Sequence, residues 1–128
     1  MSSKSKRATA LGLAPEIAEK ALNMNVETGK TATGTTIADA YDLVAEFTEF
    51  STVAASTGCQ LPDWPIGSTV YVKNSGANTL NVFPHSATGN IFTAATGAGA
   101  GTAITIATVK KGRFHRLTAT NWDYTLEN

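Results

Sequence analysis

The stretch from residue 69 to residue 84, TVYVKNSGANTLNVFP, constrains the fold of this chain more than any other. Two short runs rich in β-branched and aromatic residues, 69–73 and 79–83, flank the sequence Asn-Ser-Gly-Ala-Asn at 74–78. Asparagine favours Asx turns, and glycine accepts a positive φ at little steric cost. We therefore expect a β-hairpin with its turn at 74–78.

The two runs differ in how they distribute apolar side chains. Val70 and Val72 fall on one face of the first run, and Tyr71 falls on the other. Leu80 and Phe83 cannot share a face at period two, so the second run is apolar on both sides. Such a strand must be covered on both faces, by its own domain or by a neighbour.

The 128 residues of the chain have the length of one domain. Further β-rich runs separated by turn signals occur on both sides of residues 69–84. They are residues 40–44, 47–54, 59–61, 91–93, 103–109, 113–119 and 122–126. About eight or nine short antiparallel strands at this spacing predict an all-β fold, either a β-sandwich or a jelly-roll-like barrel. Residues 37–47 can also be scored as an amphipathic helix, because apolar residues recur there at helical spacing.

Residues 1–36 are expected to form an arm on a β domain that spans residues 37–128. The arm begins with a basic tail, continues with a short helix over 11–23 and ends in a polar linker over 25–36. A helix of this length is marginal in water on its own. Its apolar side chains must therefore dock on the body of this chain or on another subunit; they are Leu11, Leu13, Ile17 and Leu22.

Charge is unevenly distributed, although the formal net charge is zero. Between Trp64 and Val109 the only charged residue is Lys73. Protein interfaces are depleted of charge at their cores, so this region favours contact with another protein. A β-sandwich whose outer face carries Thr and Asn is the alternative.

The single cysteine, Cys59, excludes a disulfide and a cysteine-based zinc site within one copy. This usage is compatible with assembly in a reducing cytosol. No run approaches the ~20 apolar residues of a membrane span, and the start of the chain lacks the apolar core of a signal peptide. We therefore expect a soluble chain that is neither secreted nor inserted in a membrane.

Catalysis needs convergent ionisable groups, and the sequence offers few. Residues 28–31 lack the upstream glycine of a phosphate-binding loop, and the glycines of 97–101 do not form a GxGxxG pattern. His85 and His115 have no partners at metal-ligand spacing. Four carboxylates at spacings of three and four indicate a solvated acidic face more often than an acid–base pair or a cation site: Asp39, Asp42, Glu46 and Glu49. We expect neither an enzyme nor a metal or cofactor site.

A basic cluster with aromatic neighbours lies toward the C-terminus: Lys110, Lys111, Arg113 and Arg116, with Phe114, Trp122 and Tyr124. This combination can bind single-stranded nucleic acid through charge and stacking. However, the aromatic residues alternate as core residues of the last two strands should, and Lys-Lys-Gly is an ordinary solvated turn. We therefore expect no nucleic-acid partner; steep salt dependence of oligonucleotide binding would indicate one.

The span from Ala38 to the C-terminus resembles a group of small virion proteins of tailed phages and prophages. The likeness is carried by ADAY at 38–41, by TVAASTG at 52–58 with the following QLP, and by the pattern V-x-N-x-G-A-N-x-L-N-V-x-P at 72–84. It weakens at 94–101, where the group is richer in Asn-Gly, and returns at Trp122 and Tyr124. Members of this group are capsid decoration (cement) proteins or head-fibre-like proteins.

The resemblance implies a structural protein that sits on the capsid surface of the virion after assembly in the host cytoplasm. Its partner would be the major capsid (coat) protein, and it would act as a homo-oligomer, a dimer or a trimer. The expected interface residues are Leu11, Leu13, Ile17 and Leu22 in an arm that reaches a neighbour, and Tyr71, Leu80 and Phe83 in the hairpin. The alternative is a head- or tail-fibre module that binds host carbohydrate through Trp64 and Trp122.

Overall fold

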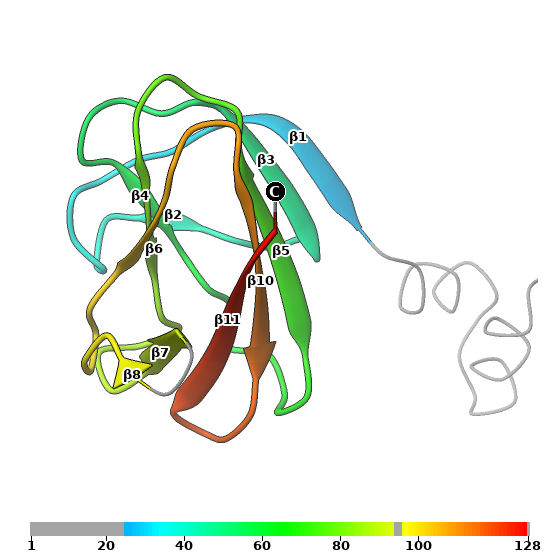
Figure 1. The fold of residues 1–128 in the computed structure, drawn as a ribbon, viewed down its shortest axis with the longest axis vertical. Helices are drawn as coiled ribbons and strands as arrows, with labels where there is room; N and C mark the ends of the chain where they lie inside the picture. Colours follow the sequence, from blue (N-terminus) through cyan, green and yellow to red (C-terminus); the bar gives the residue numbers. More distant parts are fainter. Residues whose placement is uncertain (1–24, 94–95, 128) are drawn as a thin grey trace, which may run out of the picture.

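The computed structural model describes residues 25–93 and 96–127, which form strands and connecting turns without a helix. The expected all-β class is confirmed (Figure 1). The strands are β1 (Val26–Thr31), β2 (Tyr41–Asp42), β3 (Phe47–Thr52), β4 (Gly58–Gln60), β5 (Thr69–Asn74), β6 (Leu80–Phe83), β7 (Asn90–Thr93), β8 (Thr96–Gly97), β9 (Ile104–Ile106), β10 (Lys111–Arg116) and β11 (Asn121–Glu127). None of the described residues belongs to a helix that could cross a membrane.

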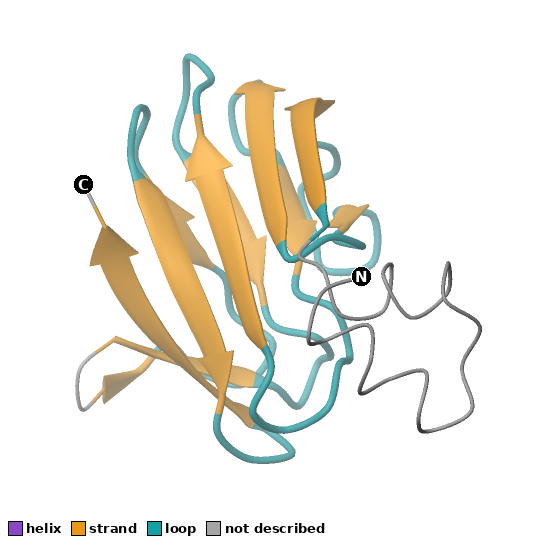
Figure 2. Cartoon of the chain, turned by 90° about the vertical axis from the view of Figure 1, so that its right-hand side faces the viewer, coloured by secondary structure: helices purple, strands orange, loops and turns teal. Residues whose placement is uncertain are grey.

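The strands form two sheets that face each other across the core (Figures 1 and 2). One sheet has seven strands in the order β1-β3-β5-β10-β11-β7-β8, and the other has four in the order β2-β4-β6-β9. Five of the nine strand pairs in the described residues are parallel and four are antiparallel, so the sheets are mixed and not antiparallel throughout as expected.

Four of the five parallel pairs have a simple cause in the path of the chain. From β1 to β6, each strand lies in the sheet opposite to the one before it. A chain that crosses to the other sheet reverses its direction, and crossing back restores it, so strands two apart in sequence become parallel neighbours. A jelly roll is built from antiparallel Greek keys, and it does not describe this winding.

The expected hairpin at 69–83 is wrong for the same reason. β5 pairs with β3 and β10, whereas β6 pairs with β4 and β9 in the other sheet. The turn between them is an arch across the core, closed by the fully buried Asn74. The Asn74 amide nitrogen donates to the carbonyls of Asn78 (2.8 Å) and Ile106 (2.9 Å), and its amide oxygen accepts the Gly76 N–H (2.9 Å).

Glycine is needed in this arch because of a close approach, not because of a positive φ. A Cβ added at Gly76 would lie 2.7 Å from the Cβ of Val53, and Gly76 is not among the residues with positive φ. The Asn78 side chain donates to the Val53 carbonyl at 2.9 Å. The arch is therefore packed directly on the segment that leaves β3.

The expected faces of β5 and β6 are confirmed. Val70 and Val72 are fully buried and Tyr71 is half-buried, while Leu80 and Phe83 are buried on opposite faces of β6. The core between the sheets contains Ala32, Leu43, Phe50, Val53, Cys59, Leu61, Val70, Val72, Leu80, Val82, Ile91, Ile104, Ile106, Phe114 and Trp122.

The structure differs from the expectations for residues 25–47. The polar linker expected at 25–36 contains β1, which pairs with β3 and so extends the seven-stranded sheet beyond the expected domain boundary at residue 37. The alternative helix at 37–47 is wrong: a turn capped by the Asp39 carboxylate leads into the two-residue strand β2. The helix expected over 11–23 lies outside the described residues.

We predict that Asn74→Ala lowers the free energy of unfolding by about 2–4 kcal/mol, because it leaves buried backbone groups without partners. Asn74→Asp should cost more, since it also buries a charge and removes both donors. The matched control is Asn81→Ala, because the half-buried Asn81 side chain makes one bond, to the Ser56 carbonyl at 3.2 Å. Urea unfolding measures the difference; equal losses at the two positions would contradict the role given to Asn74.

Candidate functional site

The outer face of the seven-stranded sheet carries an aromatic row that crosses three strands. Tyr71 on β5 is in register with Phe47 on β3 and with Arg113 on β10. The rings of Phe47 and Tyr71 are stacked, with centroids 6.1 Å apart and planes at 24°. Because Val70 and Val72 point into the core, Tyr71 and its row point outward. We call Phe47, Tyr71 and Arg113 the aromatic row.

Polar residues bound the aromatic row on both sides. One neighbouring row, in register across four strands, is Glu49, Lys73, Lys111 and Glu127, with an ion pair of 3.8 Å between Lys111 and Glu127. On the other side, the Thr69 hydroxyl lies 2.8 Å from Nδ1 of His115. Aromatic and arginine side chains within a polar rim are the usual composition of a protein-binding surface.

The residues expected at the interface differ in how far they are exposed in the structure. Tyr71 lies in the aromatic row, but Leu80 is fully buried in the core of its own chain and offers no surface to a partner. Phe83 is 9% exposed and packs beside Gly58, where an added Cβ would lie 3.2 Å from the ring. Leu11, Leu13, Ile17 and Leu22 lie outside the described residues. Phe47 was not expected at an interface, and Arg113 was expected only in the basic cluster, because only the strand register brings these two residues to Tyr71.

The arginines of the basic cluster expected from the sequence lie in different environments. Arg113 is exposed, whereas Arg116 is 8% exposed and holds the loop before β5. Its guanidinium donates to the Asp63 carboxylate (2.6 Å) and to the carbonyls of Trp64 (2.5 Å) and Ala119 (2.6 Å). It also lies 5.9 Å from the ring centroid of the buried Trp122. Arg116 therefore has a structural role and is not available to a nucleic acid.

His85 lies between Arg116 and Trp122. The Trp122 indole N–H donates to Nδ1 of His85 at 2.9 Å, and a guanidinium nitrogen of Arg116 lies 3.1 Å from Nε2. Burial and the positive charge of Arg116 lower the pKa of His85, and Asp63 opposes them. If Nδ1 of His85 were protonated, its N–H would point at the indole N–H of Trp122. Neither group could then accept a hydrogen bond, because an indole nitrogen only donates.

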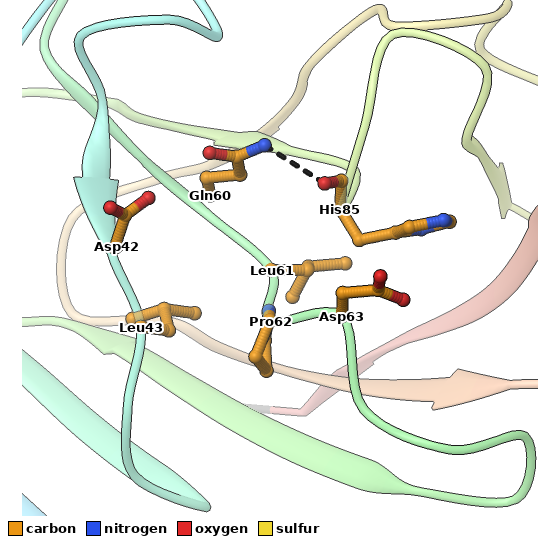
Figure 3. Close-up of a pocket in the computed structure, with 7 residues that line it drawn as sticks. All are labelled: Asp42, Leu43, Gln60, Leu61, Pro62, Asp63 and His85. Atoms are coloured by element: carbon orange, nitrogen blue, oxygen red, sulfur yellow. Dashed lines mark hydrogen bonds between the residues drawn. The ribbon is translucent and has the colours of Figure 1, made fainter.

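A pocket of about 260 Å³ opens beside His85, between β2 and the segment after β4 (Figure 3). It is lined by Asp42, Leu43, Gln60, Leu61, Pro62, Asp63 and His85. Asp63 is paired with Arg116, and the imidazole nitrogens of His85 face Trp122 and Arg116. In residues 25–93 and 96–127, no three His, Cys, Asp or Glu side chains are grouped to hold a metal ion.

The four acidic residues at spacings of three and four lie in different environments, and one of them, Glu46, lines a second hollow. Asp39 accepts the N–H groups of Thr35 and Thr36, and the bonds from Thr36 lower the pKa of its carboxyl group. Asp42 lines the pocket beside His85. Glu49 accepts the Ser75 hydroxyl at 2.9 Å. These carboxylates therefore have different neighbours.

A second hollow of about 300 Å³ lies at the end of the sheet where β3 and β5 begin. It is lined by Glu46, Trp64, Ser68 and Thr69. The Glu46 carbonyl accepts the N–H of Tyr71 at 2.6 Å, so the hollow adjoins the aromatic row. Of the two tryptophans expected to bind carbohydrate, only Trp64 reaches a hollow, because Trp122 is fully buried.

Comparison with protein-family models, with curated proteins and with solved structures finds no match to this chain. The aromatic row and the hollow at Trp64 are therefore the features from which a function can be inferred.

We predict that the free energy of unfolding falls as the pH is lowered from about 7 to 5. With its pKa lowered, folded His85 stays neutral in a range where the unfolded side chain, with a pKa of about 6.5, binds a proton. The unfolded state then binds more protons, so the free energy of unfolding decreases as the pH is lowered. His85→Gln should flatten this decrease, and His115→Gln is the control for removal of a histidine elsewhere. Equal slopes for wild type and His85→Gln in urea unfolding would contradict the prediction.

Proposed function

We propose that this chain is a capsid decoration (cement) protein of a tailed phage, a non-catalytic virion protein that binds the outer capsid lattice and bridges coat subunits. The resemblance from Ala38 to the C-terminus supports this function, and the observation that carries it is the aromatic row. The partner is the major capsid protein, and the protein acts as a dimer or trimer. It is added to the capsid surface in the host cytoplasm.

The aromatic row suits a permanent structural contact. Its side chains stand on a sheet whose other face is the core, so the surface is ordered before binding and little conformational entropy is lost. The stacked rings of Phe47 and Tyr71 supply apolar area, and Arg113 supplies directional donors. Copies at symmetry-related positions each contribute one modest interface, and their sum resists the pressure of packaged DNA.

We predict that Tyr71→Ala weakens binding to empty expanded capsids about 30-fold, which corresponds to the ~2 kcal/mol typical of a central interface residue. Thr105→Ala is the matched control, because Thr105 is exposed on β9 of the other sheet. The Thr105→Ala variant should bind capsids with the affinity of the wild type. Binding curves from co-sedimentation measure both, with circular dichroism to verify folding. Wild-type affinity of a folded Tyr71→Ala variant would contradict the assignment of this face.

The second candidate is a head- or tail-fibre module that recognises carbohydrate on the host surface. The half-buried Trp64 beside Glu46, Ser68 and Thr69 favours it, because an aromatic face with nearby polar groups suits a sugar ring. On this account, glycan-array binding depends on Trp64, and Trp64→Ala abolishes it without changing affinity for capsids. Absence of glycan binding by the wild type would exclude this candidate.

A further inference from the structure

Several residues with exposed apolar side chains lie at or beside the strand ends at one end of the seven-stranded sheet. β1, β3 and β5 are parallel and begin at this end, and the antiparallel β10 finishes there. Four of the six large hydrophobic residues that are exposed in the described part of the chain flank these strand ends: Val26 (59%), Val44 (60%), Ile66 (61%) and Leu117 (52%). We call these four residues and the hollow at Trp64 the apolar end.

The apolar end is held in place by hydrogen bonds. The Gly67 N–H donates to the Arg116 carbonyl at 2.8 Å, and the Arg116 N–H donates to the Ser68 carbonyl at 3.0 Å. The Arg116 guanidinium also fixes the carbonyl of Trp64. Ile66 is therefore exposed on a loop that is tied to the end of β10, so the surface is formed in advance of any contact.

The N-terminal segment joins the described chain beside this surface. The carbonyl of Asn25 accepts the N–H of Phe47 at 3.1 Å, and Phe47 follows Glu46 of the hollow. Leu22 precedes Asn25 by three residues, so it can lie no more than about 11 Å from it.

The dimensions of the segment also agree with the surface. Residues 11–22 in the helix that the sequence predicts would be about 18 Å long. The strand ends from β1 to β10 span three strand spacings, or about 14 Å. A helix that starts beside Asn25 and crosses these ends can therefore reach from Val26 to Leu117.

We propose that residues 11–23 of the same chain cover the apolar end, with Leu11, Leu13, Ile17 and Leu22 facing Val44, Ile66, Leu117 and the hollow at Trp64. The covalent link gives this segment an effective concentration in the millimolar range, which favours it over the same segment of a second copy. The apolar stripe of the arm then stabilises its own body instead of reaching a neighbour. The inference concerns the free protein and stands apart from capsid binding.

The fluorescence of Trp64 tests this contact. The chain has two tryptophans, and Trp122 is fully buried, so a change in solvent exposure reports on Trp64. The triple variant Leu13→Ser, Ile17→Ser and Leu22→Ser should shift the emission to longer wavelength and increase quenching by acrylamide, equally at low and high protein concentration. The same triple variant in a Trp64→Phe background should show no shift. An unchanged emission would overturn the proposal, and a shift that depends on concentration would assign the contact to a second copy.

Cross-linking gives an independent readout. Cys59 is fully buried and burial raises the pKa of its thiol, so it does not compete with introduced cysteines. A short bismaleimide should join Ile17→Cys to Ile66→Cys within one chain. The control pair is Ile17→Cys with Val109→Cys, because the Val109 N–H donates to the Asn74 carbonyl at the far end of β5. Cross-links between chains, or equal yields for the two pairs, would overturn the proposal.

Discussion

The buried side chain of Asn74 is the contact on which the rest of this structure depends. It stands at the end of β5, where the chain must leave one sheet and enter the other. Its amide joins the arch at 74–78 to β9, while its backbone pairs with the turn that leads into β10. That turn includes Val109 at a φ of 60°, an unfavourable conformation for a β-branched residue. One residue thus fixes the crossing between sheets through its side chain and the turn beside it through its backbone.

The crossing decides which side chains can meet another molecule. Because β6 enters the four-stranded sheet, Leu80 is enclosed in the core, and Tyr71 is left on the outer face of the larger sheet. There the neighbours of β5 are β3 and β10, which bring Phe47 and Arg113 to either side of Tyr71. A hairpin would have put β6 in the place of one of them. The candidate interface therefore depends on the alternation of the chain between the two sheets, and no single sequence motif contains its residues.

The sequence predicts the parts of this fold that depend on neighbouring residues. Strand positions and the faces of Val70, Tyr71 and Val72 follow from period two alone. Strand pairing does not, because Asn-Ser-Gly-Ala-Asn suits a hairpin and an arch equally, and the choice depends on a bond from Asn74 to Ile106, 32 residues away.

Two other errors have local physical causes. β1 is an edge strand whose side chains are mostly exposed, so its polar composition resembles that of a linker. Arg116 shares the inward face of β10 with Phe114, as alternation along the strand requires. Because arginine is charged, Arg116 was grouped with the exposed basic residues. Without the register of the sheet, the residues beside Tyr71 cannot be identified from the sequence.

The most direct measurement of the central claim is the number of copies bound per capsid. Purified protein is sedimented with and without empty expanded capsids of its phage, over a range of protein concentrations. We expect saturable co-sedimentation at a copy number that matches a symmetry position of the lattice. Absence of binding, with the protein found at the tail instead, would contradict decoration and favour the fibre module.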